Sequence, residues 1–170
     1  MRALVMYESM FGNTEAVARA VADGMARLAE VTVVDVGTMP LATGVDVIVL
    51  GGPTHAFGLS RPATRQDAVR QGATRDDAAT VGLREWLDAA PALSGVPAAV
   101  FDTRVDKRFS GSAARKAERR LRRLGCRMLV AAQSFHVVGT PGPLVDGERE
   151  RARRWGEAVV AAAVAATPRT

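Results

Sequence analysis

The sequence predicts an α/β domain built on a mainly parallel β-sheet with helices on both faces. Short segments rich in apolar and β-branched residues alternate with segments whose apolar residues recur at helical spacing, which favours strand–helix–strand crossovers. One segment, "GVDVIVLGG" at 44–52, is almost continuously apolar, as is typical of a strand covered on both faces. The length of 170 residues and the hydrophobic content of 48% suit one domain over residues 1–170.

The first half of the chain is expected to contain three strands and three helices. The strand segments are short and rich in apolar or β-branched residues, as in "RALVMY" and "EVTVVDV". The helical segments carry apolar residues three or four positions apart, such as Leu83, Trp86 and Leu87. The expected strands are residues 2–7, 30–36 and 44–52, and the expected helices are residues 14–28, 62–70 and 80–89.

The second half is expected to contain two strands and two helices. "VPAAVFDT" has the composition of a strand, and "RMLVAAQSFHVV" that of a strand with a bend. Between them, Ala114, Ala117 and Leu121 mark one face of a helix whose other faces carry arginines. A loop rich in Pro and Gly, "GTPGPLVDG", leads into the last helix. The expected strands are residues 96–103 and 127–138, and the expected helices are residues 112–124 and 147–166.

The net charge of +5 is concentrated in one segment. Residues 104–127 contain ten basic and two acidic residues, so the rest of the chain is slightly acidic. One interpretation is a solvated helix face in an arginine-rich protein. The other is a surface that attracts an anionic partner, an anionic substrate or the phosphate of NADPH. No aromatic residues alternate with the cations and no recognition motif is present, which argues against a nucleic-acid partner.

Membrane, thiol and metal functions find little support in the sequence. No window approaches the roughly 20 apolar residues that span a bilayer, and the N-terminus enters a strand pattern directly, so a cytosolic location is expected. Cys126 is the only cysteine, which excludes an internal disulfide, and we expect it in the core. His55 and His136 alone do not make a typical structural zinc site, and His136 is expected to be a core or edge residue of its strand.

The turn after the first strand, "ESMFGNTE", is the strongest candidate for a ligand site. In an open parallel sheet, ligands bind beyond the carboxyl ends of the strands. Ser9 and Thr14 offer hydroxyl groups, Gly12 allows close approach of the backbone, and the positive end of the next helix points to the same place. The turn holds no Lys or Arg, so a phosphate would be bound by neutral donors. The alternative is a simple helix cap that binds nothing.

Two nucleotide-binding motifs are absent from the chain. The first strand is not followed by GxGxxG, and GxxxxGK[ST] does not occur anywhere. A serine hydrolase is not favoured either, because the residues around Ser9 are not GxSxG. Dinucleotide-binding and P-loop proteins are therefore not favoured, and the turn is left as either a different phosphate site or a simple helix cap.

The sequence around this turn resembles the flavodoxin signature, from which Met6 departs mildly. "YESMFGNT" is also similar to the phosphate loop of flavodoxin-type quinone oxidoreductases, which carry a bulky residue at the position of Phe11. The order of elements matches the short flavodoxins over essentially the whole chain. The resemblance implies a five-stranded parallel sheet with strand order 2-1-3-4-5. The residues at signature positions are Val5, Tyr7, Ser9, Gly12, Thr14 and Ala18.

The resemblance further implies a site for FMN. The phosphate would rest on the first turn, and the isoalloxazine ring would lie between the loop 53–58, "PTHAFG", and the loop that starts at Asp102. His55, beside the ring, would hydrogen-bond the flavin or donate a proton during its reduction. No catalytic residue and no metal ligand is identified. The implied cofactor-binding residues are Ser9, Met10, Phe11, Gly12, Asn13, Thr14, Pro53, Thr54, His55, Ala56, Phe57, Gly58, Asp102, Thr103 and Arg104.

Two features depart from the usual flavodoxin. Flavodoxins commonly stack Trp or Tyr on the flavin, whereas Trp86 and Trp155 lie in helical patterns where we expect them to pack in the core or at its edge. Each lost ring contact weakens binding by about 0.5–1.5 kcal/mol, or up to about tenfold. Flavodoxins that act as mobile carriers are usually acidic, whereas the segment 104–127 is basic and would repel a basic docking face.

Three functional hypotheses follow. The leading one is an FMN protein that transfers electrons, either as a carrier for a redox partner protein or as a small oxidoreductase acting on a quinone or porphyrinogen, with NAD(P)H as one candidate donor. The alternative is a flavodoxin-fold protein that binds flavin weakly or not at all and acts through protein contacts. The third is a module that binds another phosphate ester or nucleotide through the same turn.

Overall fold

The computed structural model of the chain describes residues 1–55, 58–73, 81–107 and 111–166. Its sheet is parallel, and the strand order β2-β1-β3-β4-β5 confirms the predicted order 2-1-3-4-5. β2 lies on one side of β1 and β3 lies on the other, so the direction in which successive strands are added reverses between β1 and β3. The strands are β1 (Arg2–Tyr7), β2 (Glu30–Asp35), β3 (Val47–Pro53), β4 (Pro97–Val105), β5 (Arg127–Met128) and β6 (Gln133–Val137).

The expected bent strand at 127–138 is divided into β5 and β6, both of which pair with β4. Met128 lies opposite Ala98, and Gln133 lies opposite Phe101. From Met128 to Gln133 the chain advances five residues, whereas β4 advances three, from Ala98 to Phe101. The two extra residues interrupt the pairing with β4, as a bulge does. The two pieces together occupy the position of the fifth strand.

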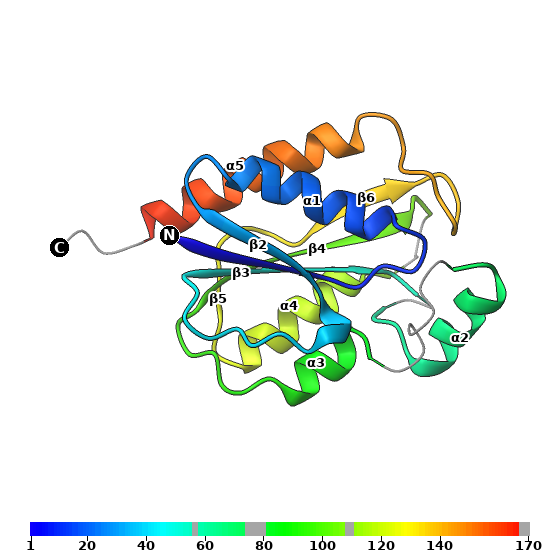
Figure 1. Ribbon diagram of the computed structural model, residues 1–170, viewed down its shortest axis with the longest axis horizontal. Coiled ribbons are helices and arrows are strands. Elements are labelled where there is room, and N and C mark those ends of the chain that lie inside the picture. The colour runs from blue at the N-terminus through cyan, green and yellow to red at the C-terminus, as the bar shows by residue number, and fades with distance from the viewer. Residues whose placement is uncertain (56–57, 74–80, 108–110, 167–170) are drawn as a thin grey trace.

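Helices cover both faces of the sheet, as Figure 1 shows. α1 and α5 lie on one face, α3 and α4 lie on the other, and α2 lies beyond the carboxyl ends of the strands. None of these described helices is both long and apolar enough to cross a membrane. The helices are α1 (Asn13–Met25), α2 (Pro62–Arg70), α3 (Leu83–Ala89), α4 (Ala113–Arg123) and α5 (Glu148–Ala165), with a short 3-10 helix at Val36–Thr38.

Two apolar clusters form the core, one on each face of the sheet. Trp86 is buried in one of them, where its indole N–H donates a hydrogen bond to the carbonyl of Pro40 at 2.9 Å. Trp155 packs edge-on against Phe101 and Phe135. Both tryptophans therefore serve packing, as predicted. Cys126 is buried as well, and this burial raises the pKa of its thiol to about 11.

α1 and α5 approach each other at two glycines. A side-chain carbon on Gly24 would overlap the backbone carbonyl of Arg153, and one on Gly156 would overlap the carbonyl of Val21. Both obstacles are backbone atoms, which cannot move aside without shifting a helix. The absence of a side chain at these two positions therefore sets the distance between α1 and α5.

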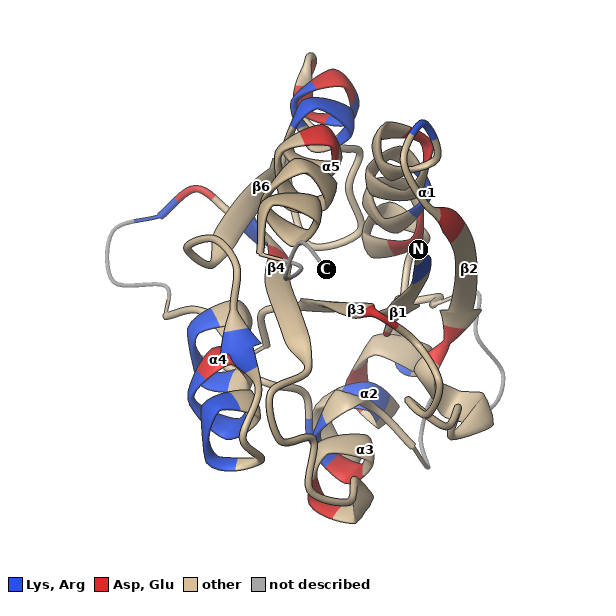
Figure 2. Cartoon of the chain, turned by 90° about the vertical axis from the view of Figure 1, so that its left-hand side faces the viewer, with Lys and Arg blue, Asp and Glu red and all other residues tan. Residues whose placement is uncertain are grey.

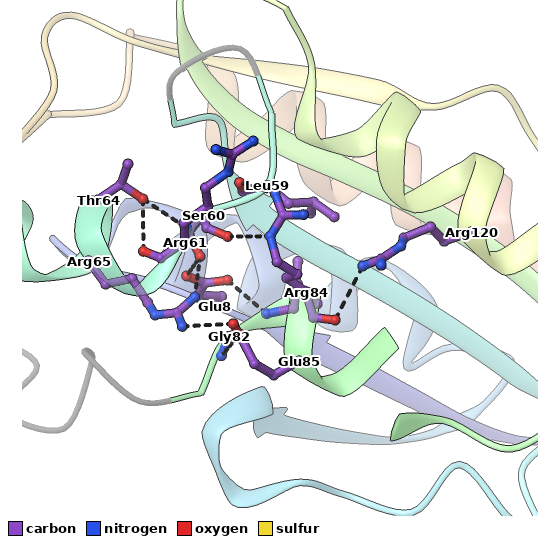
Figure 3. Close-up of polar contacts among 11 residues, drawn as sticks. Glu8, Leu59, Ser60, Arg61, Thr64, Arg65, Gly82, Arg84, Glu85 and Arg120 are labelled. Carbon is purple, nitrogen blue, oxygen red and sulfur yellow. Dashed lines mark hydrogen bonds and ion pairs between the residues drawn. The ribbon is translucent and has the colours of Figure 1, made fainter. Parts of the chain in front are cut away.

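A buried polar cluster joins the end of β1 to α2 and α3 (Figure 3). Glu8, 1% exposed, follows β1 directly. Its carboxylate accepts a hydrogen bond from the hydroxyl of Ser60 and another, at 2.8 Å, from the backbone N–H of Leu83. A buried carboxylate needs such donors, because burial without them is strongly unfavourable. Glu8 therefore fixes the loop after β3 and the start of α3 to the first strand.

Arg65 of α2 completes this cluster although its side chain is fully buried. Its Nη1 donates to Ser60 Oγ at 2.8 Å, and its Nη2 lies 3.0 Å from Glu85 Oε1. The pKa of Glu85 lies below its ordinary value: burial raises it, but the hydrogen bonds from Arg65 and from the N–H of Gly82 outweigh that effect. The cluster thus connects α2, α3 and the sheet through charged groups.

We predict that Gly156→Ala destabilises the protein although alanine favours helices. Helix propensity alone would add up to about 1 kcal/mol of stability. The overlap with the carbonyl of Val21 should outweigh this gain and give a net loss of about 1–3 kcal/mol. Urea unfolding of Gly156→Ala and of the exposed control Ala158→Gly checks it. The control should lose only the propensity term, and a Gly156→Ala protein more stable than wild type would contradict the prediction.

We also predict that Arg65→Met lowers the free energy of unfolding by about 3–5 kcal/mol. The substitution leaves the carboxylate of Glu85 and the polar groups around Ser60 without their buried cation. Arg70→Met removes a cation of the same helix whose ion pair with Asp67 is exposed, so it should change stability by less than about 0.5 kcal/mol. Equal unfolding midpoints for the two variants would show that the buried cluster contributes little.

Candidate functional site

The predicted turn lies at the carboxyl end of β1 and begins α1. Gly12 adopts a left-handed conformation, with φ of 85°, at the position before the helix. Its N–H donates to the hydroxyl of Ser9 at 3.1 Å. In the described part of the chain no side chain caps α1, so the N–H groups of its first turn face outward with the positive end of the helix dipole. This is the arrangement that binds a phosphate or another anion.

Thr14 connects the turn to the fourth strand. Its hydroxyl lies 2.7 Å from the hydroxyl of Thr103, and both residues are buried. The carbonyl of Thr103 in turn accepts the N–H of Thr54 at 2.9 Å. Three segments that are distant in the sequence therefore meet at this point, and they are the three loops that the sequence assigns to the site.

His55 closes the loop after β3 and carries a buried polar atom. Its backbone forms two hydrogen bonds of 2.8 Å with Gly58, which hold these two residues side by side. Burial, and secondarily the positive charge of Arg65, lower the pKa of the imidazole, which keeps it neutral near pH 7. Among the described residues, Nε2 of His55 has no hydrogen-bond partner. A ligand with a polar edge would satisfy this atom.

Asp102 has a structural position at the end of β4, underneath the loops. It is fully buried, and its Oδ2 accepts hydrogen bonds from Thr54 Oγ1 at 3.0 Å, Ser112 Oγ at 2.6 Å and the N–H of Ala114 at 3.0 Å. These partners belong to the second loop and to the start of α4. Asp102 thus holds the loop after β3 and the start of α4 together through hydrogen bonds. It does not line the hollow described below.

A hollow lies between these segments, and its enclosed part measures about 60 Å³. Most of the predicted cofactor-binding residues surround it. Gly12 lies in the turn without lining the hollow, Gly58 faces Lys116 of α4, and Ala56 and Phe57 lie outside the described residues. The predicted residues in its wall are Ser9, Met10, Phe11, Asn13, Thr14, Pro53, Thr54, His55, Thr103 and Arg104.

The wall also includes Val105, Val137 and Thr140, which the sequence did not single out. Thr140 belongs to the loop after β6. This loop reaches the first turn, because the side-chain amide of Asn13 donates to the carbonyl of Pro141 at 3.2 Å. The rule that ligands bind at the carboxyl ends of parallel strands applies to β6 as well, so the position of this loop in the sequence was a usable signal.

A wider hollow of about 550 Å³ lies between α1 and α5. Two ion pairs lie in its wall, Arg19 with Glu15 and Arg153 with Glu150, each at 2.7 Å. None of the buried, unpaired polar atoms of the described residues lies in its wall. The smaller hollow at the carboxyl ends of the strands is therefore the better candidate site.

Comparison with known proteins agrees with this geometry. The flavodoxin family model matches residues 5–155. The structure is similar to oxidised flavodoxin 1 from Bacillus cereus, with 21% identity, a TM-score of 0.69, and 99% of this chain and 100% of that chain covered. It is also similar to a flavodoxin from the domain Archaea, with 19% identity, a TM-score of 0.67, and 96% and 99% covered.

A third similar structure is the WrbA-like flavodoxin protein from Agrobacterium tumefaciens, with 17% identity, a TM-score of 0.62, and 98% of this chain and 99% of that chain covered. No curated protein matches the chain by sequence. At these identities the structures establish the shared fold, and the family model establishes the relationship. The chain belongs to the flavodoxin family, whose members bind a flavin and transfer electrons through it.

Proposed function

We propose that this protein binds FMN at the hollow beyond β1, β3 and β4 and transfers electrons through it. The observation that carries the proposal is the uncapped N-terminus of α1 beside the buried, unpaired Nε2 of His55. One end of the site offers N–H groups to a phosphate, and the other offers a polar atom to the edge of a ring. FMN has both groups, whereas riboflavin lacks the phosphate.

The phosphate end of the site would work without cations. Ser9 and Thr14 supply hydroxyl groups, and α1 supplies backbone N–H groups and its dipole. Thr14 would exchange its hydrogen bond with Thr103 for one to the phosphate, or donate to the phosphate while accepting from Thr103. Because a hydroxyl can donate and accept at once, this contact does not require the turn to rearrange.

The ring end is narrower and less aromatic. The aromatic side chains of the described wall are Phe11 and His55, and the enclosed volume of about 60 Å³ is well below the roughly 300–1,000 Å³ of typical ligand pockets. A flavin ring would therefore lie partly on the surface or separate the loops. This observation favours a second candidate function, in which the protein binds flavin weakly and acts through protein contacts.

When bound, FMN supplies the chemistry of one- and two-electron transfer. The residues of this chain would bind and orient it, and the neutral imidazole of His55 would exchange a hydrogen bond with it. A small oxidoreductase that reduces a quinone or porphyrinogen with NAD(P)H remains the second form of this proposal beside the electron carrier. Steady quinone reduction by NAD(P)H would favour the enzyme, and turnover only with a coupled reductase would favour the carrier. We take residues 1–170 as one domain acting in the cytosol.

We predict that Ser9→Ala combined with Thr14→Val weakens FMN binding at least tenfold and changes riboflavin binding much less. A hydrogen bond to a charged group contributes about 1.5–3 kcal/mol, and each 1.4 kcal/mol is a factor of ten in affinity. Titration of the flavin-free protein into FMN and into riboflavin, followed by quenching of flavin fluorescence, measures both affinities.

The matched control for this experiment is Thr103→Val. It removes the same hydrogen bond between Thr14 and Thr103 but leaves both hydroxyls of the turn in place. The control should affect FMN and riboflavin equally. Equal losses for both ligands in the Ser9/Thr14 variant would show that the turn does not hold the phosphate, and no binding of FMN to wild type would favour the second candidate function.

A further inference from the structure

The exposed surface of α4 carries an unusual concentration of positive charge. α4 contains six basic residues and one acidic residue. Figure 2 shows the basic residues gathered over this helix, whereas basic and acidic residues alternate on α5. We define the basic face as the side chains of Arg115, Lys116, Arg119 and Arg123.

The side chains of the basic face are not paired with carboxylates. Arg120 pairs with Asp88, and Arg122 pairs with Glu118, but in the described part of the chain no ion pair involves the four residues of the basic face. On α5, by contrast, Arg151 pairs with Glu148 and Arg153 pairs with Glu150 and Glu157. An arginine-rich composition alone would not separate the two helices in this way.

Helix stability does not account for the basic face either. Cations are favourable in the last turn of a helix, which suits Arg123 but does not apply to Arg119, one turn earlier. Arg115 and Lys116 lie in the first turn, after the cap residue Ser112, where the helix dipole disfavours positive charge. The charge at this end of α4 is therefore better explained by something that it binds.

The N-terminal end of α4 lies against the candidate flavin site. The N–H of Ala113 donates to Thr54 Oγ1 at 2.9 Å, and Asp102 accepts the N–H of Ala114. The side chain of Lys116 packs directly on Gly58, at the end of the loop 53–58. A β-carbon added to Gly58 would lie only 2.5 Å from Lys116 Nζ. Any molecule seated on the basic face would thus adjoin the loop that would border the ring.

The length and the convex shape of the basic face indicate what kind of partner would bind it. From Arg115 to Arg123 the face follows the outside of a helix for about 12 Å, at 1.5 Å per residue. Charges spread over a convex surface suit an extended acidic surface better than a single phosphate group, which needs converging donors. The sequence of α4 contains no aromatic residue that would stack on single-stranded nucleic acid.

We propose that the basic face docks an acidic electron-transfer protein next to the flavin. This inference rests on the proposed FMN function. An encounter would transfer one electron from the reduced metal centre of the partner, which becomes oxidised, to the oxidised flavin, which becomes reduced. The attraction would raise the association rate at low ionic strength and would be screened by salt.

The test uses a reduced acidic [2Fe–2S] ferredoxin as the donor and the FMN-loaded protein as the acceptor. Stopped-flow measurement at about 20 and 200 mM salt should show the second-order rate constant falling several-fold as salt rises. Arg115→Glu combined with Arg119→Glu should lower the rate at low salt about tenfold and remove the salt dependence. Oxidation of the FMN-loaded, reduced protein by a basic c-type cytochrome should show the opposite trend with salt.

The matched control is Arg27→Glu combined with Arg154→Glu, which changes the net charge equally. Arg27 follows α1 and Arg154 lies on α5, and these two helices cover the face of the sheet opposite α4 (Figure 1). The control should change the rate less than threefold. Equal effects of the two double variants, or no effect of either, would overturn the docking proposal and leave FMN binding untouched.

A second readout does not depend on flavin. Titration of the flavin-free protein with the ferredoxin, followed by calorimetry at low salt, should give a Kd that Arg115→Glu with Arg119→Glu weakens about tenfold. If the protein takes up no FMN, the proposed function fails, and this titration still decides the docking. Tighter binding of a 20-base-pair DNA duplex than of ferredoxin at 150 mM salt would identify a nucleic acid as the partner and overturn the proposal.

Discussion

Two buried carboxylates, one at the end of β1 and one at the end of β4, determine how the loops around the site are held. Glu8 and Asp102 are both almost inaccessible to water, and each needs donors because an unpaired buried carboxylate is highly unfavourable. Glu8 takes its donors from Ser60 and the start of α3, and Asp102 takes its donors from the second loop and the start of α4. Through these two carboxylates the sheet positions the loops at its carboxyl ends.

The hydrogen bonds of Asp102 connect the ligand site with α4, the helix that carries the basic face. Thr54 donates to Asp102 and accepts from Ala113, so the second loop and the first turn of α4 share one hydrogen-bonded group. On the other side, burial lowers the pKa of His55, and the positive charge of Arg65, which also anchors α2, lowers it further. The imidazole in the wall of the hollow therefore depends electrostatically on a cation that belongs to the structural cluster.

The helices, the strands and the parallel α/β class were predictable from local signals, whereas the strand order was predicted from the resemblance to flavodoxins. Periodicity in the sequence located the helices to within a few residues, and the apolar runs located the strands. The division of the expected strand 127–138 was not predictable, because it depends on register against β4. Glu8 was missed since a charged residue after a strand normally reads as exposed, and Thr140 was missed since it meets Asn13 only through tertiary structure. The hydrogen bonds that Asp102 Oδ2 accepts from Thr54, Ser112 and Ala114 were not predictable either, and its assignment to the cofactor site stays a prediction.

The positive charges of this protein lie away from the proposed phosphate site, so ligand binding and partner binding would use different groups. The phosphate turn has no cation, so an anionic ligand there would be held by backbone N–H groups, hydroxyls and the helix dipole. The cations of α4 lie further out, on its exposed side, where salt screens them. A change in ionic strength would therefore act more strongly on encounters with a charged partner than on ligand binding. Had the same cations been in the turn, the two processes would be coupled, and a partner's acidic surface would compete with the phosphate for them.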